Sequence, residues 1–143
     1  MAKMSRNTNR PSRQVVGTTG LYYVCYQLSK RGWNVLPTSR NARGVDVVVY
    51  SQEGARTHTI QVKTLSKGDP VPLGTSLNNL IADCIVICRR PFSVEPEIFI
   101  ATTDEVKSHI HEEMKDGKKS YWLEPKDYED FRDNWNIIGG GYD

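Results

Sequence analysis

The segments Gly44-Val45-Asp46-Val47-Val48-Val49-Tyr50 and Ile60-Gln61-Val62-Lys63-Thr64 decide the expected fold. Both are rich in β-branched residues, which favours strands, and a polar stretch containing Glu53-Gly54 separates them, as in a β-hairpin. A hairpin with its turn at Glu53-Gly54 places Asp46 opposite Gln61. Because side chains alternate along a strand, Lys63 then projects from the same face. The opposite, packing face consists of Val45, Val47, Val49, Ile60 and Val62.

A carboxylate, an amide and an ammonium group would therefore meet on one patch of sheet. Mg²⁺ or Mn²⁺ accepts such oxygen ligands: the carboxylate of Asp46, the side-chain carbonyl of Gln61 and the backbone carbonyl of Val62. Lys63 would hold or deprotonate an attacking water, or neutralise charge on a phosphate. The pattern thus predicts metal-assisted phosphodiester hydrolysis. The alternative is a partly buried Asp46–Lys63 salt bridge with Gln61 acting only as a hydrogen-bonding residue.

The charge distribution points to a polyanionic partner. Residues 1–90 hold 13 Lys and Arg against 4 Asp and Glu, residues 91–143 hold 6 against 13, and residues 1–45 contain no acid. Neutralising phosphates releases counterions and drives association, so we expect this basic half to bind a polyanion. A flexible basic arm with solvated helix ends is the simpler alternative. The candidate DNA-binding residues are Arg10, Arg13, Arg40, Arg43 and Lys67.

The remaining pattern predicts an α/β domain with a central mixed β-sheet flanked by helices. A helix capped by Thr18 or Thr19 should end at Gly32, and a second should open with a capping box at Thr102–Glu105 and carry His109 and His111. A last helix should begin at Pro125, with Tyr128, Phe131 and Trp135 on its core face. Further strands are expected at 33–36, 85–88, 97–101 and 120–123, a long loop at 66–79, and a turn at Asp116-Gly117.

Length and composition restrict the class of protein. A chain of 143 residues suits one domain, which we place at 15–138, with a basic flexible arm at 1–14 and a frayed tail at 139–143. No apolar run approaches the roughly 20 residues that span a bilayer, and the N-terminus is not a secretory signal. Three cysteines among apolar neighbours indicate reduced core residues, so we expect a cytoplasmic protein without a membrane anchor.

With these residues in place, the chain resembles the PD-(D/E)xK nuclease superfamily, the restriction-endonuclease-like fold that includes Holliday-junction resolvases and Mrr-like enzymes. The resemblance runs from about Gly17 to Thr64. It implies that Asp46 is the first acid of the motif, Lys63 its lysine and Gln61 a variant of its middle acid. The expected activity is then that of a Mg²⁺-dependent DNA endonuclease, in which Asp46, Gln61 and Lys63 are catalytic and the basic half holds duplex or branched DNA.

The resemblance departs at the first helix, where family members often carry a glutamate just after the glycine. Here Gly20 is followed by Leu21, so the site has one formal carboxylate and should bind Mg²⁺ weakly unless phosphate oxygens complete its coordination shell. Two alternatives stay open: a catalytically decayed DNA-binding or assembly module, and an interaction protein that docks through its acidic C-terminal half. If the chain cuts both strands with one site each, it should work as a homodimer.

Overall fold

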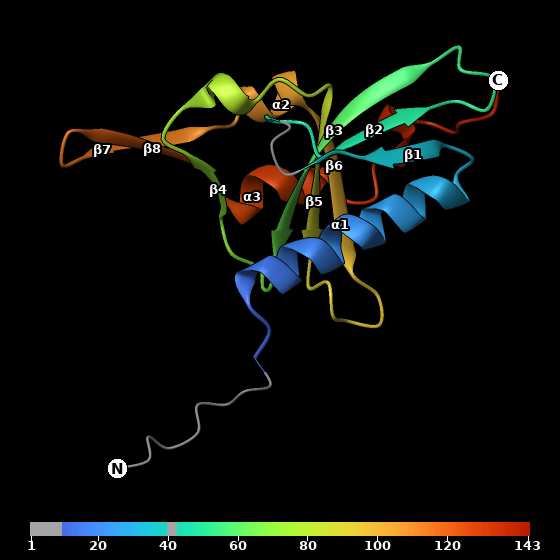
Figure 1. Ribbon diagram of the computed structural model, residues 1–143. Coiled ribbons are helices and arrows are strands. Elements are labelled where there is room, and N and C mark those ends of the chain that lie inside the picture. The colour runs from blue at the N-terminus through green and yellow to red at the C-terminus, as the bar shows by residue number, and fades with distance from the viewer. Residues whose placement is uncertain (1–9, 40–42) are drawn as a thin grey trace.

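The computed structural model describes residues 10–39 and 43–143 (Figure 1). A five-stranded sheet with the order β1-β2-β3-β5-β6 forms the centre, and a smaller sheet has the order β4-β8-β7. The predicted α/β class with a central mixed sheet flanked by helices is confirmed. The strands of the large sheet are β1 (Asn34–Pro37), β2 (Val47–Tyr50), β3 (Thr57–Leu65), β5 (Cys84–Arg89) and β6 (Glu97–Thr102).

The first helix, α1 (Arg13–Lys30), lies along one face of the large sheet and begins earlier than the sequence indicates. Its N-cap is Ser12, whose hydroxyl accepts a hydrogen bond from the Val15 N–H at 3.2 Å, so the predicted threonine cap is wrong. Thr19 instead donates its hydroxyl to the Val15 carbonyl inside the helix. The predicted end is confirmed, because Gly32 follows Lys30 and Arg31 with a φ of 92°.

The central strands have the expected pairing. β2 and β3 are antiparallel with Val47 opposite Ile60, which is the register predicted from the position of the turn. β3 then runs parallel to β5, and β5 pairs antiparallel with β6. Every residue of β5 is buried, as expected of a strand that is covered on both faces.

Two of the predictions from the sequence are wrong in the region of the smaller sheet. It consists of β4 (Val71–Gly74), β7 (His111–Lys115) and β8 (Lys118–Leu123). The expected loop at 66–79 therefore holds a strand, and also a 3₁₀ turn at Leu77–Asn79. The second helix, α2 (Thr103–Lys107), has the predicted capping box but stops early, so His109 lies in a turn and His111 opens a strand.

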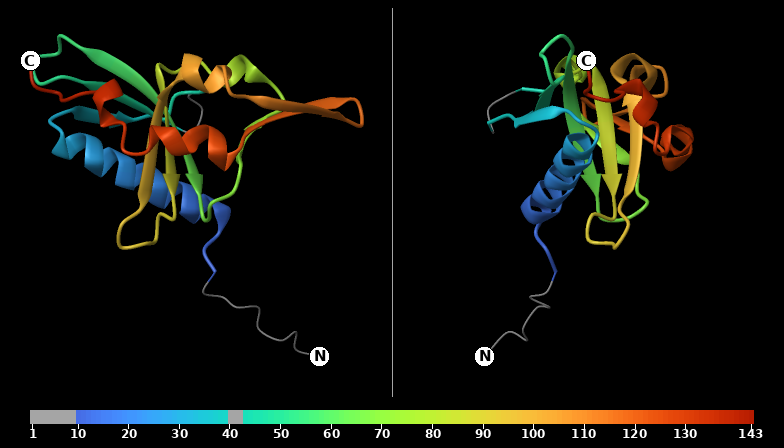
Figure 2. Two further views of the ribbon diagram at one scale, coloured as in Figure 1. Left: turned by 180° about the vertical axis from the view of Figure 1, so that it is seen from behind. Right: turned by 90° about the vertical axis from the view of Figure 1, so that its right-hand side faces the viewer.

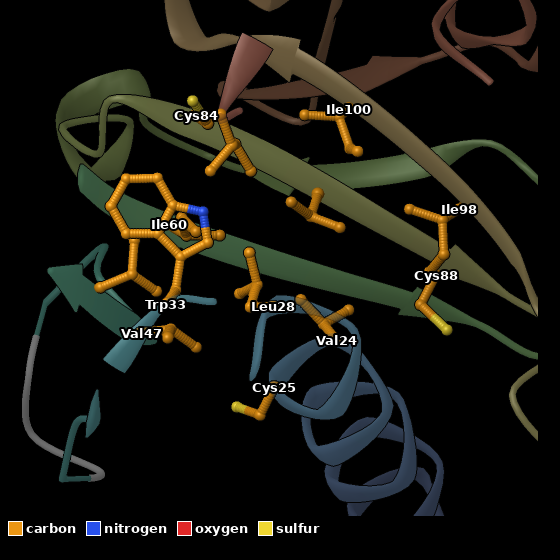
Figure 3. Close-up of a cluster of buried hydrophobic side chains, with 13 residues drawn as sticks. Val24, Cys25, Leu28, Trp33, Val47, Ile60, Cys84, Cys88, Ile98 and Ile100 are labelled. Carbon is orange, nitrogen blue, oxygen red and sulfur yellow. The ribbon is translucent and has the colours of Figure 1, made fainter. Parts of the chain in front are cut away.

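The core has two parts, one on each face of the large sheet. On the α1 side, Val24, Leu28 and Trp33 pack on alternate strand residues together with all three cysteines (Figure 3). The cysteines are free and buried, and burial raises the pKa of Cys25 and Cys84 to about 11 and that of Cys88 to about 12. They are reduced core residues, as predicted.

The second part of the core is covered by α2, by the small sheet and by α3 (Pro125–Tyr128). Pro125 begins α3 as predicted. The prediction of a single helix with Tyr128, Phe131 and Trp135 on its core face is wrong. The chain continues as 3₁₀ turns at Glu129–Phe131 and Trp135–Ile137. Tyr128 and Phe131 consequently pack on this second part, whereas Trp135 packs on the α1 side.

The C-terminal residues are hydrogen-bonded to the body, which differs from the expected frayed tail at 139–143. The Gly139 carbonyl accepts the Trp33 indole N–H at 2.9 Å, and Gly141 bonds through its backbone to Arg31 and Gln52. The C-terminus consequently lies beside the turn that joins β2 to β3 (Figure 1). No helix in the described residues is long and apolar enough to cross a membrane.

Candidate active site

Asp46 lies immediately before β2 and is held from both neighbouring strands. Its backbone N–H donates to the Ile60 carbonyl at 2.9 Å, and its own carbonyl accepts the Thr38 N–H at 2.9 Å. Thr38 also donates its hydroxyl to the Val45 carbonyl at 2.6 Å. The β-branched run after Asp46 fixes β2 in register, so the position of the carboxylate follows from the packing of the hairpin.

The carboxylate occupies the edge of β3 just beyond Val47, the first residue of β2. Asp46 Oδ2 accepts the Val62 N–H at 2.8 Å, in place of a strand-to-strand hydrogen bond. Since the N–H and C=O of one strand residue point to the same edge, the Val62 carbonyl also points toward this edge. In the described part of the chain, no hydrogen bond engages Asp46 Oδ1. The edge therefore presents a carboxylate oxygen and a backbone carbonyl together.

Gln61 and Lys63 share the sheet face opposite α1, because they pair in register with Ile85 and Ile87. Gln61 is only 9% exposed, yet its Oε1 is the one buried side-chain polar atom without a hydrogen-bond partner in the described residues. Leaving a buried carbonyl unsatisfied costs about 1–3 kcal/mol. An unpaired buried oxygen at this position is the kind of group that a metal ligand presents in the absence of its ion.

Lys63 is partly buried, and this desolvation lowers the pKa of its ammonium group, whereas the charge of Asp46 acts to raise it. Among the ion pairs within 4.0 Å in the described residues, none joins these two side chains. The alternative reading of a direct Asp46–Lys63 salt bridge is therefore wrong. Lys63 therefore lies close enough to Asp46 for the carboxylate to affect its pKa, and its amino group remains available to a water molecule or a phosphate.

A cavity of about 350 Å³ lies between this edge and the first turns of α1. It brings together Asp46, Val62 and Lys63, whereas Gln61 is their neighbour in the chain but does not line it. α1 can approach so closely because Gly20 has no side chain: a Cβ there would lie 2.1 Å from Thr64 Oγ1. The helix residues that line the cavity are Arg13, Gln14, Gly17, Thr18 and Leu21.

Leu21 therefore stands at the site, where the resemblance places a glutamate, and it also packs partly on the core. The described residues contain no group of three or more His, Cys, Asp or Glu side chains able to hold a metal ion. The available donor set is one carboxylate, one side-chain amide and backbone carbonyl oxygen. Because this set carries a single negative charge, a divalent ion would need phosphate oxygens to complete its octahedral shell.

The predicted DNA-binding residues separate into three groups. Arg10 and Arg13 line a second cavity, which shares Arg13 and Thr64 with the first, so both lie beside the site. Arg43 is exposed and donates to Asn79 Oδ1 at 2.5 Å, and Lys67 is exposed just after β3. Arg40 lies outside the described residues.

The sequence analysis missed Gln14 and Thr18 as residues of the site. Because it began the helix at Thr18 or Thr19, both fell at or before the helix start and could not be assigned to a face. The available signal was Ser12, a good N-cap residue, which would have moved the start of the helix six or seven positions toward the N-terminus.

No protein-family model matches this chain, and no curated protein sequence matches it either. Solved structures do resemble it. A bacterial homing endonuclease, I-Ssp6803I, superposes with a TM-score of 0.64 at 17% identity, covering 90% of this chain and 92% of that one. The Holliday junction resolvase Hjc from Archaeoglobus fulgidus superposes with a TM-score of 0.55 at 13% identity, covering 82% of this chain and 99% of that one.

Both are restriction-endonuclease-like structures. The chain therefore has a restriction-endonuclease-like fold over most of its length, as its sequence predicts. At these identities the likeness establishes the fold, and it leaves the role of each residue to be argued from its chemistry.

Proposed function

We propose that this chain is a metal-dependent DNA endonuclease whose site is built on Asp46, Gln61, Val62 and Lys63. The observation that carries the proposal is the unpaired, buried Gln61 Oε1, next in the chain to the edge where the Asp46 carboxylate and the Val62 backbone meet. An oxygen donor set of this kind suits Mg²⁺ or Mn²⁺. Bound there, such an ion would polarise the scissile phosphate and lower the pKa of an attacking water.

The residues of the chain then divide the work. Asp46 Oδ1, Gln61 Oε1 and the Val62 carbonyl are the groups that would hold the ion. Lys63 has a lowered pKa, so more of it is the neutral amine than in an ordinary lysine. That amine takes the proton from the water as the water oxygen bonds to phosphorus and the bond to the leaving oxygen breaks, and the leaving oxygen takes a proton from solvent water. Protonated afterwards, Lys63 offsets the negative charge that accumulates on the phosphate.

The basic residues beside the site would position the DNA backbone. Arg10 and Arg13 flank the cavity at the start of α1, and we assign Arg40, Arg43 and Lys67 the same role on the basis of their charge. Phosphate contacts position a duplex without reading its sequence, which suits side chains at the rim of a catalytic site. The likeness to a homing endonuclease and to a resolvase supports duplex or branched DNA as the partner.

Two further parts of the proposal concern the whole protein. One site per chain cuts one strand, so cleavage of both strands requires a homodimer with two-fold symmetry. Three buried, unpaired cysteines fit a reducing compartment, so we place the protein in the cytoplasm.

The test is cleavage of supercoiled and four-way-junction DNA with Mg²⁺ or Mn²⁺. We expect cutting that is lost in Asp46→Ala and in Lys63→Ala, and a rate for the wild-type protein that rises with pH below the ordinary pKa of lysine, 10.5. Asp46→Asn is the matched variant, because its amide oxygen can still accept the Val62 N–H while the charge is removed. Cutting that survives in Asp46→Asn would contradict the assigned role of the carboxylate.

A second candidate is a catalytically decayed module that binds DNA through the same fold. The observation in its favour is Leu21, which lines the cavity where a second carboxylate is expected. Wild-type protein that binds DNA but does not cut, combined with cutting by Leu21→Glu, would establish this reading. If the wild-type protein cuts and Leu21→Glu only lowers its stability, Leu21 is a core residue and the endonuclease proposal stands.

A further inference from the structure

The β7–β8 hairpin projects from the body and has no partner on its outer strand within the described residues (Figures 1 and 2). Five residues of β7 at about 3.4 Å each give an arm of about 17 Å. Its tip is a two-residue turn at Asp116-Gly117, both with positive φ, which is the tight turn that fits strand twist. Four of the five β7 residues are exposed, so core packing does not explain the arm.

The two faces of this small sheet differ. One face carries Val71, Leu73 and Leu123, which are buried in the core. The other face is open to solvent. It consists of four cross-strand pairs, which are Pro72 with Trp122, His111 with Trp122, Glu113 with Ser120, and Lys115 with Lys118. The open face thus forms a continuous strip from β4 to the tip of the hairpin.

The base of this strip is held by side-chain contacts and lies next to the cavities of the candidate site. The His111 ring stacks on Trp122 at 5.8 Å between centroids, and its Nε2 bonds to Asp127 Oδ2 at 2.7 Å. Pro72, at the other end of the same row, lines the cavity that contains Arg10 and Arg13. That cavity shares Arg13 with the site cavity. A ligand bound at the site could therefore extend along the strip without leaving the surface.

The tip of the strip carries an unfavourable arrangement of charge. Lys115 and Lys118 are directly opposite each other, and like charges in that position destabilise a strand pair. No ion pair in the described residues relieves either of them, whereas Lys119, on the other face, lies 3.9 Å from Glu112. On the open face the strands of the hairpin carry one acid, Glu113, which lies nearer the base, and the turn between the two lysines carries Asp116. Two exposed, unpaired positive charges at the end of an arm suit a polyanion.

We infer that the β7–β8 hairpin binds duplex DNA beside the cleavage site, with Lys115 and Lys118 on the phosphate backbone. The inference rests on the proposed function for the identity of the polymer. A two-stranded ribbon of this width fits the DNA major groove, which is about 12 Å wide. The hairpin gives the enzyme a hold on the duplex one arm's length away from the bond that it cuts.

The experiment measures binding of the full chain to a fluorescein-labelled duplex by anisotropy, without divalent metal, between roughly 50 and 200 mM salt. The variants are Lys115→Ala/Lys118→Ala and the matched control Lys107→Ala/Lys126→Ala, which removes two exposed lysines from α2 and α3. Each lost phosphate contact reduces the slope of log affinity against log salt by about 0.9, so the hairpin variant should lose about 1.8. The control variant should keep the slope of the wild-type protein.

A slope that is unchanged in the hairpin variant overturns the inference, even if the wild-type protein cuts DNA. A reduced slope in the hairpin variant, together with a wild-type protein that never cuts, supports the inference and removes the endonuclease proposal instead. Sedimentation of both variants tests whether the arm instead binds a second copy of the chain. Loss of a dimer in the hairpin variant alone, with its slope unchanged, would make the arm a contact between copies and overturn the inference. Thermal unfolding checks that both variants fold, which their exposed positions predict.

Discussion

Gln61→Met should make the protein more stable in EDTA and weaken its response to metal. Gln61 Oε1 is buried without a partner, and such a group costs about 1–3 kcal/mol of folding free energy. Methionine has a similar length and volume and no carbonyl, and volume-conserving exchanges in a core cost less than about 1.5 kcal/mol. We therefore expect a net gain of about 1 kcal/mol in EDTA, which for a domain of this size raises Tm by roughly 3 °C.

The same variant should lose most of the stabilisation that Mn²⁺ gives the wild-type protein. A ligand at ten times its Kd stabilises the folded state by about 1.4 kcal/mol. Without the Gln61 carbonyl the ion is held by the remaining donors alone, so the Tm shift on adding Mn²⁺ should shrink and cutting should stop. Wild-type and variant proteins would thus exchange their order of stability between EDTA and Mn²⁺.

The assay is thermal unfolding followed by circular dichroism in EDTA and in Mn²⁺. Gln27→Met is the control, because Gln27 is hydrogen-bonded to Tyr23 and Arg31 and is not part of the site. It should lower Tm in both buffers and leave the Mn²⁺ shift intact. Lower stability of Gln61→Met in EDTA, or an equal Mn²⁺ shift in Gln61→Met and wild type, would refute the reasoning.

Two further predictions concern the scaffold. Gly20→Ala should destabilise the protein by about 1–3 kcal/mol in urea unfolding, because its Cβ would overlap Thr64, whereas Gly17→Ala, with no atom within 4 Å, should stabilise α1 by up to about 1 kcal/mol; equal effects would contradict the close approach. Hydrogen bonds, first of all from Arg89, lower the pKa of Glu97 from 4.5 to about 2. Because this pKa is depressed in the folded state, its contribution of about 2–3 kcal/mol is complete above pH 4.5 and is lost as the pH falls toward 2. Glu97→Gln should remove that part of the acid-induced loss of stability, and an unchanged profile between these pH values would count against it.

The central hairpin could be predicted because several local signals agree. The β-branched runs, the polar turn and the alternation of side chains all require the same register, and the observed pairing of Val47 with Ile60 is that register. The fold class followed from this hairpin, the buried β5 run and the flanking helix. In the part of the chain that carries the site, the local sequence patterns are compatible with only one strand register. They were therefore sufficient to predict it.

The small sheet could not be predicted, because its strands have little sequence signal of their own. β4 contains Pro72 and Gly74, which favour a loop, and it becomes a strand because Val71 and Leu73 are buried against β8. β7 is mostly charged, and its form is set by the tight turn at Asp116-Gly117 and by pairing with β8. Long-range pairing of this kind overrides local propensity.

The site was predictable in part, for a related reason. Spacing along two strands brought Asp46 near Lys63, but the role of α1 depends on how closely a helix approaches a strand. That approach requires a residue without a side chain at Gly20, where α1 faces Thr64, and no local pattern contains this long-range contact. The cavity, and with it Gln14 and Thr18, therefore emerged only from the three-dimensional structure.

The most direct test of the metal site is an anomalous-diffraction measurement on crystals of the wild-type protein bound to duplex DNA and soaked in Mn²⁺. We predict one strong peak at the β3 edge, from an ion ligated by Asp46, Gln61 Oε1, the Val62 carbonyl and a phosphate oxygen. Density that is absent there while the scissile phosphate is in place, or a manganese ion bound elsewhere without contact to Asp46, would contradict it.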